Sequence, residues 1–201
     1  MLDHLVSMPL PFTPGGLIFD CDGTLADTMP LHYRAWRATL DQAGHPAIFT
    51  EEQFYAWAGA PAYEILERLA EQHGVTLALA ELTHEKEMTY QKLIPLLTPI
   101  EPVLAEMRRF QGTVPMAVVS GGMKVLVDET LDILGIRTCF EIVIGSGEVT
   151  KGKPEPEGML LAARALGIAP KDCVVYEDGP AGIEAARRAG MLAVDITKFI
   201  G

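Results

Sequence analysis

Short apolar runs alternate with helix-length amphipathic segments through most of the chain. The segments Val125–Leu134, Glu157–Leu166 and Ala181–Ala189 have helical periodicity, and each is followed by a glycine suited to a helix end. Such alternation predicts a doubly wound α/β core around a parallel sheet. The runs expected to form its strands are Leu17–Phe19, Met116–Val119, Ile142–Ile144, Val174–Tyr176 and Leu192–Val194.

The interval 31–97 departs from this rhythm, because it is rich in Ala, Glu, Leu and Gln and has no convincing strand. We therefore expect a small helical domain, residues 31–97, inserted into an α/β core made of residues 1–30 and 98–201. Prolines punctuate the joints between its helices. The expected helices are His32–Ala43, Glu51–Trp57, Ala62–Gln72 and Leu79–Leu93.

Composition narrows the class of protein. Of 201 residues, 49% are hydrophobic and 21% charged, which suits a globular chain. The net charge of −11 disfavours binding to nucleic acid and to anionic membranes. No apolar stretch approaches the 18 residues of a membrane-spanning helix, and the N-terminus resembles no export signal. The odd number of cysteines, three, suggests reduced thiols. We therefore expect a cytoplasmic protein.

The segment Asp20–Leu25, with sequence Asp-Cys-Asp-Gly-Thr-Leu, follows the first expected strand directly. Its carboxylates, Asp20 and Asp22, therefore emerge at the sheet edge where open α/β folds bind their ligands. Two acids so close favour a nearby cation, and an oxygen-preferring ion such as Mg²⁺ fits. Taken alone, Asp22-Gly23-Thr24 is more typical of a plain turn.

Further polar groups follow the other expected strands, and this coincidence favours function. Ser120-Gly121-Gly122 offers a hydroxyl and exposed N–H groups at a helix start for phosphate oxygens; the alternative is Ser120 as a helix N-cap. Lys153 precedes Pro154, which favours an extended lysine able to neutralise a phosphoryl group, although a solvated lysine is the alternative. Glu177-Asp178 could complete a metal site or simply begin a helix.

Read together, these four elements resemble the motifs of the haloacid dehalogenase superfamily, in the same order along the chain. The resemblance extends from Gly16 to about Val194 and implies a Rossmann-like core with a helical cap. It implies a magnesium-dependent phosphatase in which Asp20 attacks phosphorus and Asp22 acts as general acid and base. Ser120 and Lys153 would bind the phosphoryl group. The metal ligands implied are Asp20, the Asp22 backbone carbonyl, Asp178 and Glu177, the last directly or through water.

Asp27–Trp36 resembles the hinge and first cap helix of the β-phosphoglucomutase-like subgroup, which includes small bacterial sugar phosphatases acting on fructose 1-phosphate or 6-phosphogluconate. The resemblance implies that the substrate is a small phosphorylated metabolite, with a sugar phosphate favoured, and that the cap closes to exclude water. The residues expected to contact the substrate are Gly121, Gly122, Thr28, His32, Gly59, Ala60 and Lys86.

Other enzyme classes are disfavoured by single positions. Gly147–Lys153 satisfies most of a nucleotide-binding P-loop, but Pro154 stands where a hydroxyl residue is required. His84–Met88 has methionine in place of the second histidine of a zinc protease. Dehalogenation is disfavoured because relatives with that activity lack the aspartate that Asp22 supplies.

Two alternatives stay open. A phosphoglucomutase-type transferase needs an arginine for a second phosphate, and Ala62 stands at the matching place. A protein that binds a phosphorylated metabolite without turnover would keep the fold, but every group needed for turnover is present. We expect a monomeric phosphatase.

Overall fold

The computed structural model describes residues 4–58 and 60–200. Contacts divide the chain into two compact units. The first, here called the core unit, comprises Met1–Asp27 and Thr98–Gly201, and the second, the helical unit, comprises Thr28–Leu97.

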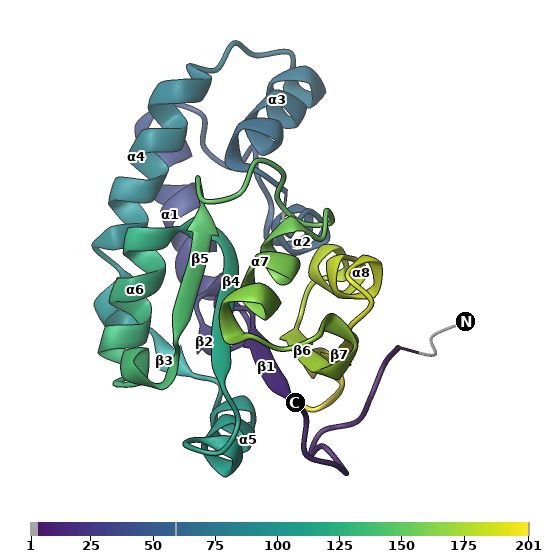
Figure 1. The fold of residues 1–201 in the computed structure, drawn as a ribbon. Helices are drawn as coiled ribbons and strands as arrows, with labels where there is room; N and C mark the ends of the chain where they lie inside the picture. Colours follow the sequence, from purple (N-terminus) through teal and green to yellow (C-terminus); the bar gives the residue numbers. More distant parts are fainter. Residues whose placement is uncertain (1–3, 59, 201) are drawn as a thin grey trace. The chain divides into compact units, whose positions relative to one another are not determined.

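The core unit is built on a five-stranded sheet of order β5-β4-β1-β6-β7 in which every pairing is parallel (Figure 1). Successive strands are added first on one side of β1 and then on the other, as in doubly wound folds. The predicted fold class is confirmed. The strands are β1 (Gly16–Phe19), β4 (Met116–Met123), β5 (Ile142–Ser146), β6 (Cys173–Glu177) and β7 (Leu192–Asp195).

Helices cover both faces of this sheet, which is why β1 is apolar at consecutive positions. Leu17 and Phe19 belong to the apolar cluster shared with α5 and α6, whereas Ile18 belongs to the cluster shared with α7 and α8. All three side chains are fully buried. The helices are α5 (Glu101–Phe110), α6 (Lys124–Ile133), α7 (Glu157–Leu166) and α8 (Pro180–Arg188).

Four elements of the core unit, α5, β2, β3 and β4, differ from the sequence predictions. Helix α5 was not predicted, although Pro102 in its first turn and its buried Val103, Leu104 and Met107 follow a helical spacing. A two-residue antiparallel pair, β2 (Ala26–Asp27) with β3 (Thr98–Pro99), was also missed. Strand β4 continues beyond Val119, its predicted end, to Met123.

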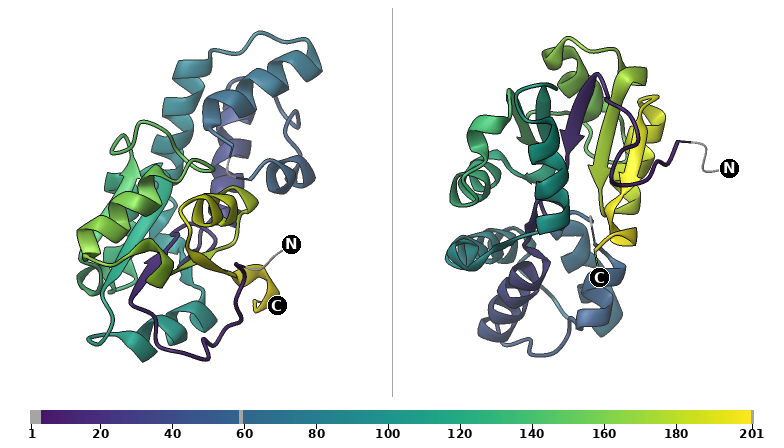
Figure 2. Two further views of the ribbon diagram at one scale, coloured as in Figure 1. Left: turned by 45° about the vertical axis from the view of Figure 1, so that its right-hand side comes forward. Right: turned by 90° about the horizontal axis from the view of Figure 1, so that it is seen from below.

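The segment before β1 packs along the core unit. The N–H of Val6 donates to the carbonyl of Ala193 at 2.8 Å, so this segment extends the sheet beside β7 (Figure 2). Further along, the Leu10 N–H donates to Oε1 of the buried Glu106 at 2.7 Å. Glu106 also accepts from the hydroxyl of Tyr176 at 3.2 Å, and burial with the nearby carboxylate raises the pKa of Tyr176.

The helical unit has its own apolar core, in which aromatic side chains dominate. Phe49 packs edge-on against Trp36 and stacks on Trp57, with Leu66 and Leu69 fully buried beside them. The helices are α1 (Met29–Gln42), α2 (Glu51–Ala56), α3 (Ala62–His73) and α4 (Leu79–Gln91). Short 3₁₀ turns complete the structure: η1 (Ile94–Leu96) here, and η2 (Arg137–Cys139), η3 (Pro170–Asp172) and η4 (Ile196–Lys198) in the core unit.

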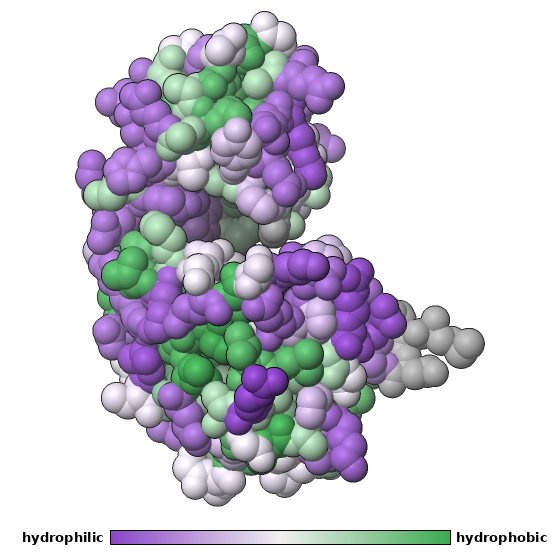
Figure 3. All heavy atoms as spheres, turned by 45° about the horizontal axis from the view of Figure 1, so that its top comes forward, coloured by the Kyte–Doolittle hydropathy of each residue, from purple (hydrophilic) through white to green (hydrophobic). Residues whose placement is uncertain are grey.

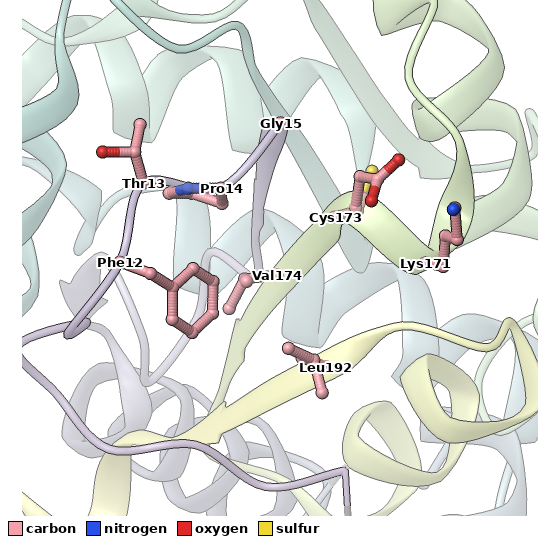
Figure 4. Close-up of a pocket in the computed structure, with 9 residues that line it drawn as sticks. Phe12, Thr13, Pro14, Gly15, Lys171, Cys173, Val174 and Leu192 are labelled. Atoms are coloured by element: carbon pink, nitrogen blue, oxygen red, sulfur yellow. The ribbon is translucent and has the colours of Figure 1, made fainter.

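A cavity of about 150 Å³ lies in the core unit at the beginnings of β6 and β7. Its lining includes Phe12 and Gly15 from the segment before β1, with Cys173 and Leu192 from the strands (Figure 4). It is therefore at the amino end of the sheet, opposite the edge where β1 leads into Asp20.

On the face drawn in Figure 3, hydrophilic side chains surround smaller apolar patches. Among the described residues, none of the helices has the length and apolar character needed to span a bilayer.

Replacing Glu106 with leucine should destabilise the core unit. The buried Leu10 N–H and Tyr176 hydroxyl would lose their acceptor, and we expect a loss of about 3 kcal/mol in the free energy of unfolding. Urea unfolding followed by far-UV circular dichroism measures it. Glu101→Leu, on the exposed face of the same helix, is the control and should cost less than about 1 kcal/mol. Equal losses in both variants would contradict the role of Glu106.

The thiol of Cys173 should resist alkylation in the folded protein. The residue is fully buried, and burial, together with the neighbouring Asp172 charge, raises its pKa to about 11. Iodoacetamide reacts with the thiolate, and the raised pKa leaves very little thiolate at pH 7.5. Labelling of the folded protein at this pH should therefore be at least about 100-fold slower than labelling in urea. Peptide mass spectrometry against time measures the rate, and equal rates in both solvents would refute the expectation.

Candidate active site

Asp20 begins the candidate site, at the carboxyl end of β1. Its N–H donates to the carbonyl of Tyr176 at 2.9 Å, which continues the pairing of β1 with β6 past the end of the strand. The residue is only 6% exposed. Since β1 is flanked by β4 and β6 and all three run parallel, the segments that follow these strands are brought to the same edge of the sheet.

The loop after Asp20 turns tightly. The N–H groups of Leu25 and Ala26 both donate to the carbonyl of Cys21. Gly23 has a φ of +85°, and a Cβ at this position would press against the carboxylate of Asp178. Thr24, fully buried, donates its hydroxyl to Oδ1 of Asp178 at 3.0 Å. This loop therefore holds Asp178 close to the end of β1.

Asp22 contacts Ser120. The Ser120 hydroxyl donates to Oδ2 of Asp22 at 3.4 Å and accepts from the N–H of Gly122 at 2.9 Å. The prediction that Ser120, Gly121 and Gly122 stand at a helix start is wrong. They lie within β4, in an irregular stretch between Val119 and Met123, which both pair with β5, and α6 begins only at Lys124 with Met123 as its N-cap.

Lys153 joins two carboxylates. Its Nζ lies 2.5 Å from Oδ1 of Asp20 and 2.6 Å from Oε2 of Glu177, and all three side chains are largely buried. Burial alone would lower the pKa of Lys153, but the Asp20 and Glu177 charges raise it, so the ammonium is retained. Lys153 and Pro154 are the central residues of a turn closed by a hydrogen bond from the N–H of Glu155 to the carbonyl of Gly152, and the peptide bond between the two is cis.

The acids of the site are crowded. Carboxylate oxygens of Asp20, Glu177 and Asp178 lie within 4.8 Å of one another. Burial and the Glu177 charge raise the pKa of Asp20 to about 7, and burial and the Asp20 charge raise that of Asp178 to about 6. Three oxygen donors in a largely buried cluster match a hard divalent cation such as Mg²⁺. The side chain of Asp22 is not in this cluster; its predicted contribution was a backbone carbonyl.

Glu177 depends on a glycine in the next helix. Gly182, on α8, is buried, and a Cβ there would overlap the Glu177 carboxylate. The same carboxylate accepts from the N–H of Gly179 at 3.1 Å. The absence of a side chain at Gly182 therefore leaves the space in which Glu177 meets Lys153.

Two of the predicted substrate contacts meet within the helical unit. Nζ of Lys86, which is 6% exposed, lies 3.0 Å from Nδ1 of His32 and 2.9 Å from Oε1 of Glu87. The ammonium is also within 6 Å of the rings of Trp36 and Tyr90. A lysine so enclosed is held in one place by contacts on several sides.

The other predicted substrate contacts of the helical unit are Thr28, Ala60 and Gly59. Thr28 is fully buried at the N-cap position of α1, and its carbonyl accepts from the N–H of His32 at 2.9 Å. Ala60 is partly buried against the aromatic core of the helical unit. Gly59 lies outside the described residues.

Comparisons with known proteins decide the family. Residues 15–190 match the model of the haloacid dehalogenase-like hydrolases. A fructose-1-phosphate phosphatase of Escherichia coli is 37% identical over 183 residues, 90% of this chain and 95% of the relative. A beta-phosphoglucomutase of Bacillus subtilis is 32% identical over 191 residues, covering 90% and 82%. The crystal structure of beta-phosphoglucomutase from Clostridium difficile has a TM-score of 0.74 at 27% identity and covers 90% of this chain and 83% of that one.

The chain belongs to the haloacid dehalogenase-like hydrolase family. The predicted family and enzyme class, a phosphatase hydrolase, are thereby confirmed. Hydrolases of this family generally use Mg²⁺, and the carboxylate cluster around Asp20 has the donors to bind it.

Sequence reasoning missed three residues of this hydrolase. Thr24 and Gly182 lie inside the motifs that were recognised, but neither spacing nor composition indicates that one bonds Asp178 and the other makes room for Glu177. Glu87 follows Lys86 directly, and neighbours in a helix do not face each other by periodicity, so no pattern signals their ion pair.

Gly182→Ala should weaken metal binding. Alanine normally stabilises a helix relative to glycine by up to about 1 kcal/mol, but here its methyl group displaces the Glu177 carboxylate from Lys153. We expect the affinity for Mg²⁺, measured by titration calorimetry, to fall by about 10-fold to 100-fold.

Gly152→Ala is the matched control for this substitution. It adds the same methyl group beside Lys153, in open space, and should leave the affinity within about twofold. Unchanged binding in Gly182→Ala would show that Glu177 does not need this space.

Proposed function

We propose that this hydrolase removes phosphate from a small phosphorylated metabolite, in particular a sugar phosphate, through an aspartyl-phosphate at Asp20. The observation that carries the proposal is the contact of Lys153 Nζ with Asp20 Oδ1 at 2.5 Å, beside the carboxylates of Glu177 and Asp178. A buried carboxylate next to a fixed ammonium is suited to meet a phosphoryl group, because the ammonium offsets negative charge on both partners.

In the first step of this proposal, an Asp20 oxygen bonds to phosphorus while the bond from phosphorus to the substrate oxygen breaks. Asp22, as a carboxylic acid, gives its proton to the departing alkoxide, and the alcohol leaves. Lys153, the Ser120 hydroxyl and the N–H of Gly121 hold the phosphoryl oxygens, and Gly122, whose N–H donates to the Ser120 hydroxyl, orients that hydroxyl beside them.

The second step reverses the role of Asp22. Now a carboxylate, Asp22 takes a proton from water as the water oxygen bonds to phosphorus and the bond from Asp20 to phosphorus breaks. Inorganic phosphate is released and both aspartates return to their starting states. Asp22 has both roles, and the hydrogen bond that it accepts from Ser120 holds it beside β4, the strand that carries the proposed phosphate-binding groups.

The proposed metal ion, Mg²⁺, would be held by Asp20, the backbone carbonyl of Asp22 and Asp178, with Glu177 direct or through water. When bound, it supplies positive charge against the phosphoryl oxygens and against the crowded carboxylates.

For the helical unit we propose the role of a cap that contacts the part of the substrate beyond its phosphoryl group. Lys86 and His32 are the contacts we favour, since the enclosure of the Lys86 ammonium fixes it in one position. Thr28, Gly59 and Ala60 complete the proposed set. A phosphoglucomutase among the relatives keeps phosphoryl transfer between sugars as the second candidate, but Ala62 offers no charge to a second phosphate.

Asp20→Asn should abolish turnover. Asparagine cannot form the acyl phosphate, so kcat for Mg²⁺-dependent release of inorganic phosphate from sugar phosphates should fall by at least about 10³-fold. Asp132→Asn, an equal charge change on the exposed face of α6, should leave the rate within about twofold.

A second measurement separates the chemistry from mere loss of folding. In the wild type, acid quenching during turnover followed by peptide mass spectrometry should find a phosphate adduct on Asp20. An active enzyme that carries no adduct there, or an active Asp20→Asn variant, would refute the proposed nucleophile.

A further inference from the structure

Lys153 is carried by an irregular loop, residues 147–156, between β5 and α7. Thr150, Lys151 and Gly152, which lead into Lys153, are exposed to solvent. A loop with so little packing opens readily unless hydrogen bonds hold it. Yet Nζ of Lys153 lies beside two carboxylates, at 2.5 and 2.6 Å. The position of this ammonium therefore depends on what fixes the backbone of the loop.

Glu157, the first residue of α7, closes this loop on itself. Its Oε1 accepts from the N–H of Thr150 and its Oε2 accepts from the N–H of Lys151, each at 2.9 Å. These two backbone hydrogen bonds lower the pKa of the Glu157 carboxyl, so the group is ionised at neutral pH and both bonds are charge-assisted. One side chain thus joins the two ends of the segment that contains Lys153.

Between these ends, the backbone around Lys153 has little freedom. The N–H of Glu155 donates to the carbonyl of Gly152 at 3.0 Å, which closes the turn that contains Lys153. The Glu155 carboxylate also accepts from Arg188 of α8 at 2.7 Å, but the two side chains are 45% and 38% exposed, so this surface ion pair contributes little. The two bonds of Glu157 therefore hold the loop more firmly than the ion pair does.

We propose that Glu157 is a positioning residue of this hydrolase, which keeps Lys153 at the phosphoryl site by fixing the loop that carries it. The inference rests on the proposed function in one respect, the binding of the phosphoryl group by Lys153. A carboxylate suits the role because it has two acceptor oxygens and no hydrogen to donate. Glutamine has the same shape but only one acceptor oxygen, and its NH₂ group would face a second donor.

Tryptic cleavage after Lys151 measures the loop without reference to activity. The bond between Lys151 and Gly152 lies in exposed chain, whereas the bond after Lys153 precedes a proline and resists trypsin. Loss of one charge-assisted hydrogen bond should open the loop more often, so native Glu157→Gln should be cut after Lys151 at least about tenfold faster than the wild type. Peptide mass spectrometry against time measures the rate.

Glu155→Gln is the matched control. It removes the same charge from the same loop, and with it any effect of that charge on the protease, but it breaks only the surface pair with Arg188. Its cleavage rate should stay within about threefold of the wild-type rate. Equal acceleration in the two variants, or no acceleration in Glu157→Gln, would overturn the anchoring of the loop by Glu157.

Mg²⁺ and inorganic phosphate report separately on the position of Lys153. When its ammonium leaves Asp20 and Glu177, these carboxylates lose part of their compensation, so Mg²⁺ should bind Glu157→Gln at least as tightly as the wild type. Inorganic phosphate, added with saturating Mg²⁺, should bind at least about threefold more weakly, because the ammonium is in place for a smaller fraction of the time. Titration calorimetry measures both affinities. Damage to the fold would lower both together, and that result would contradict a positioning role.

The outcomes separate this inference from the function beneath it. If the wild type releases no phosphate from any sugar phosphate with Mg²⁺ present, the proposed function fails, and the tryptic rates still decide whether Glu157 anchors the loop. In an active enzyme, Glu157→Gln should lower kcat/KM at least about threefold, and Glu155→Gln should leave it within about twofold. Faster cleavage of Glu157→Gln with unchanged kcat/KM and unchanged phosphate affinity would overturn its role in positioning Lys153.

Discussion

The repulsion among carboxylates at the end of β1 is the constraint on which this site depends. Asp20, Glu177 and Asp178 lie too close together to be ionised in a buried place without compensation, and burial raises the pKa of each. Lys153 provides part of that compensation from a different loop. The remaining negative charge of the cluster favours binding of a further cation. Neighbouring residues keep the carboxylates in place: Thr24 orients Asp178, and Gly182 leaves space for Glu177.

Convergence of the candidate site residues could be predicted from sequence, because parallel strands bring the residues that follow them to one edge of the sheet. Asp20, Ser120, Lys153 and Asp178 follow apolar runs that are recognisable without a structure, and all five strands of the sheet begin within a residue of their predicted starts. The helix after β3 was missed although its pattern was present. Pro99, just before this helix, was interpreted only as punctuation of a joint, and Pro102 in its first turn was not considered as a helix start.

What sequence could not supply is the identity of partners. Periodicity assigns a face or a strand end, but the choice between Lys153 and a metal as the neighbour of Glu177 depends on where a loop turns. The limit of β4 shows a related difficulty, since Ser120-Gly121-Gly122 has the composition of a turn and forms an irregular stretch of β4 between Val119 and Met123, which both pair with β5. Lys86 and Glu87 were adjacent letters in the sequence, and only the fold shows that both are shielded from solvent and bonded to each other.

Both tryptophans of the chain, Trp36 and Trp57, lie in the helical unit, where each packs against Phe49. The core unit has none. Intrinsic indole emission is thus a natural reporter confined to one unit. Unfolding or rearrangement of the helical unit can be followed by tryptophan fluorescence without an added dye, whereas the sheet and its carboxylates contribute no tryptophan signal.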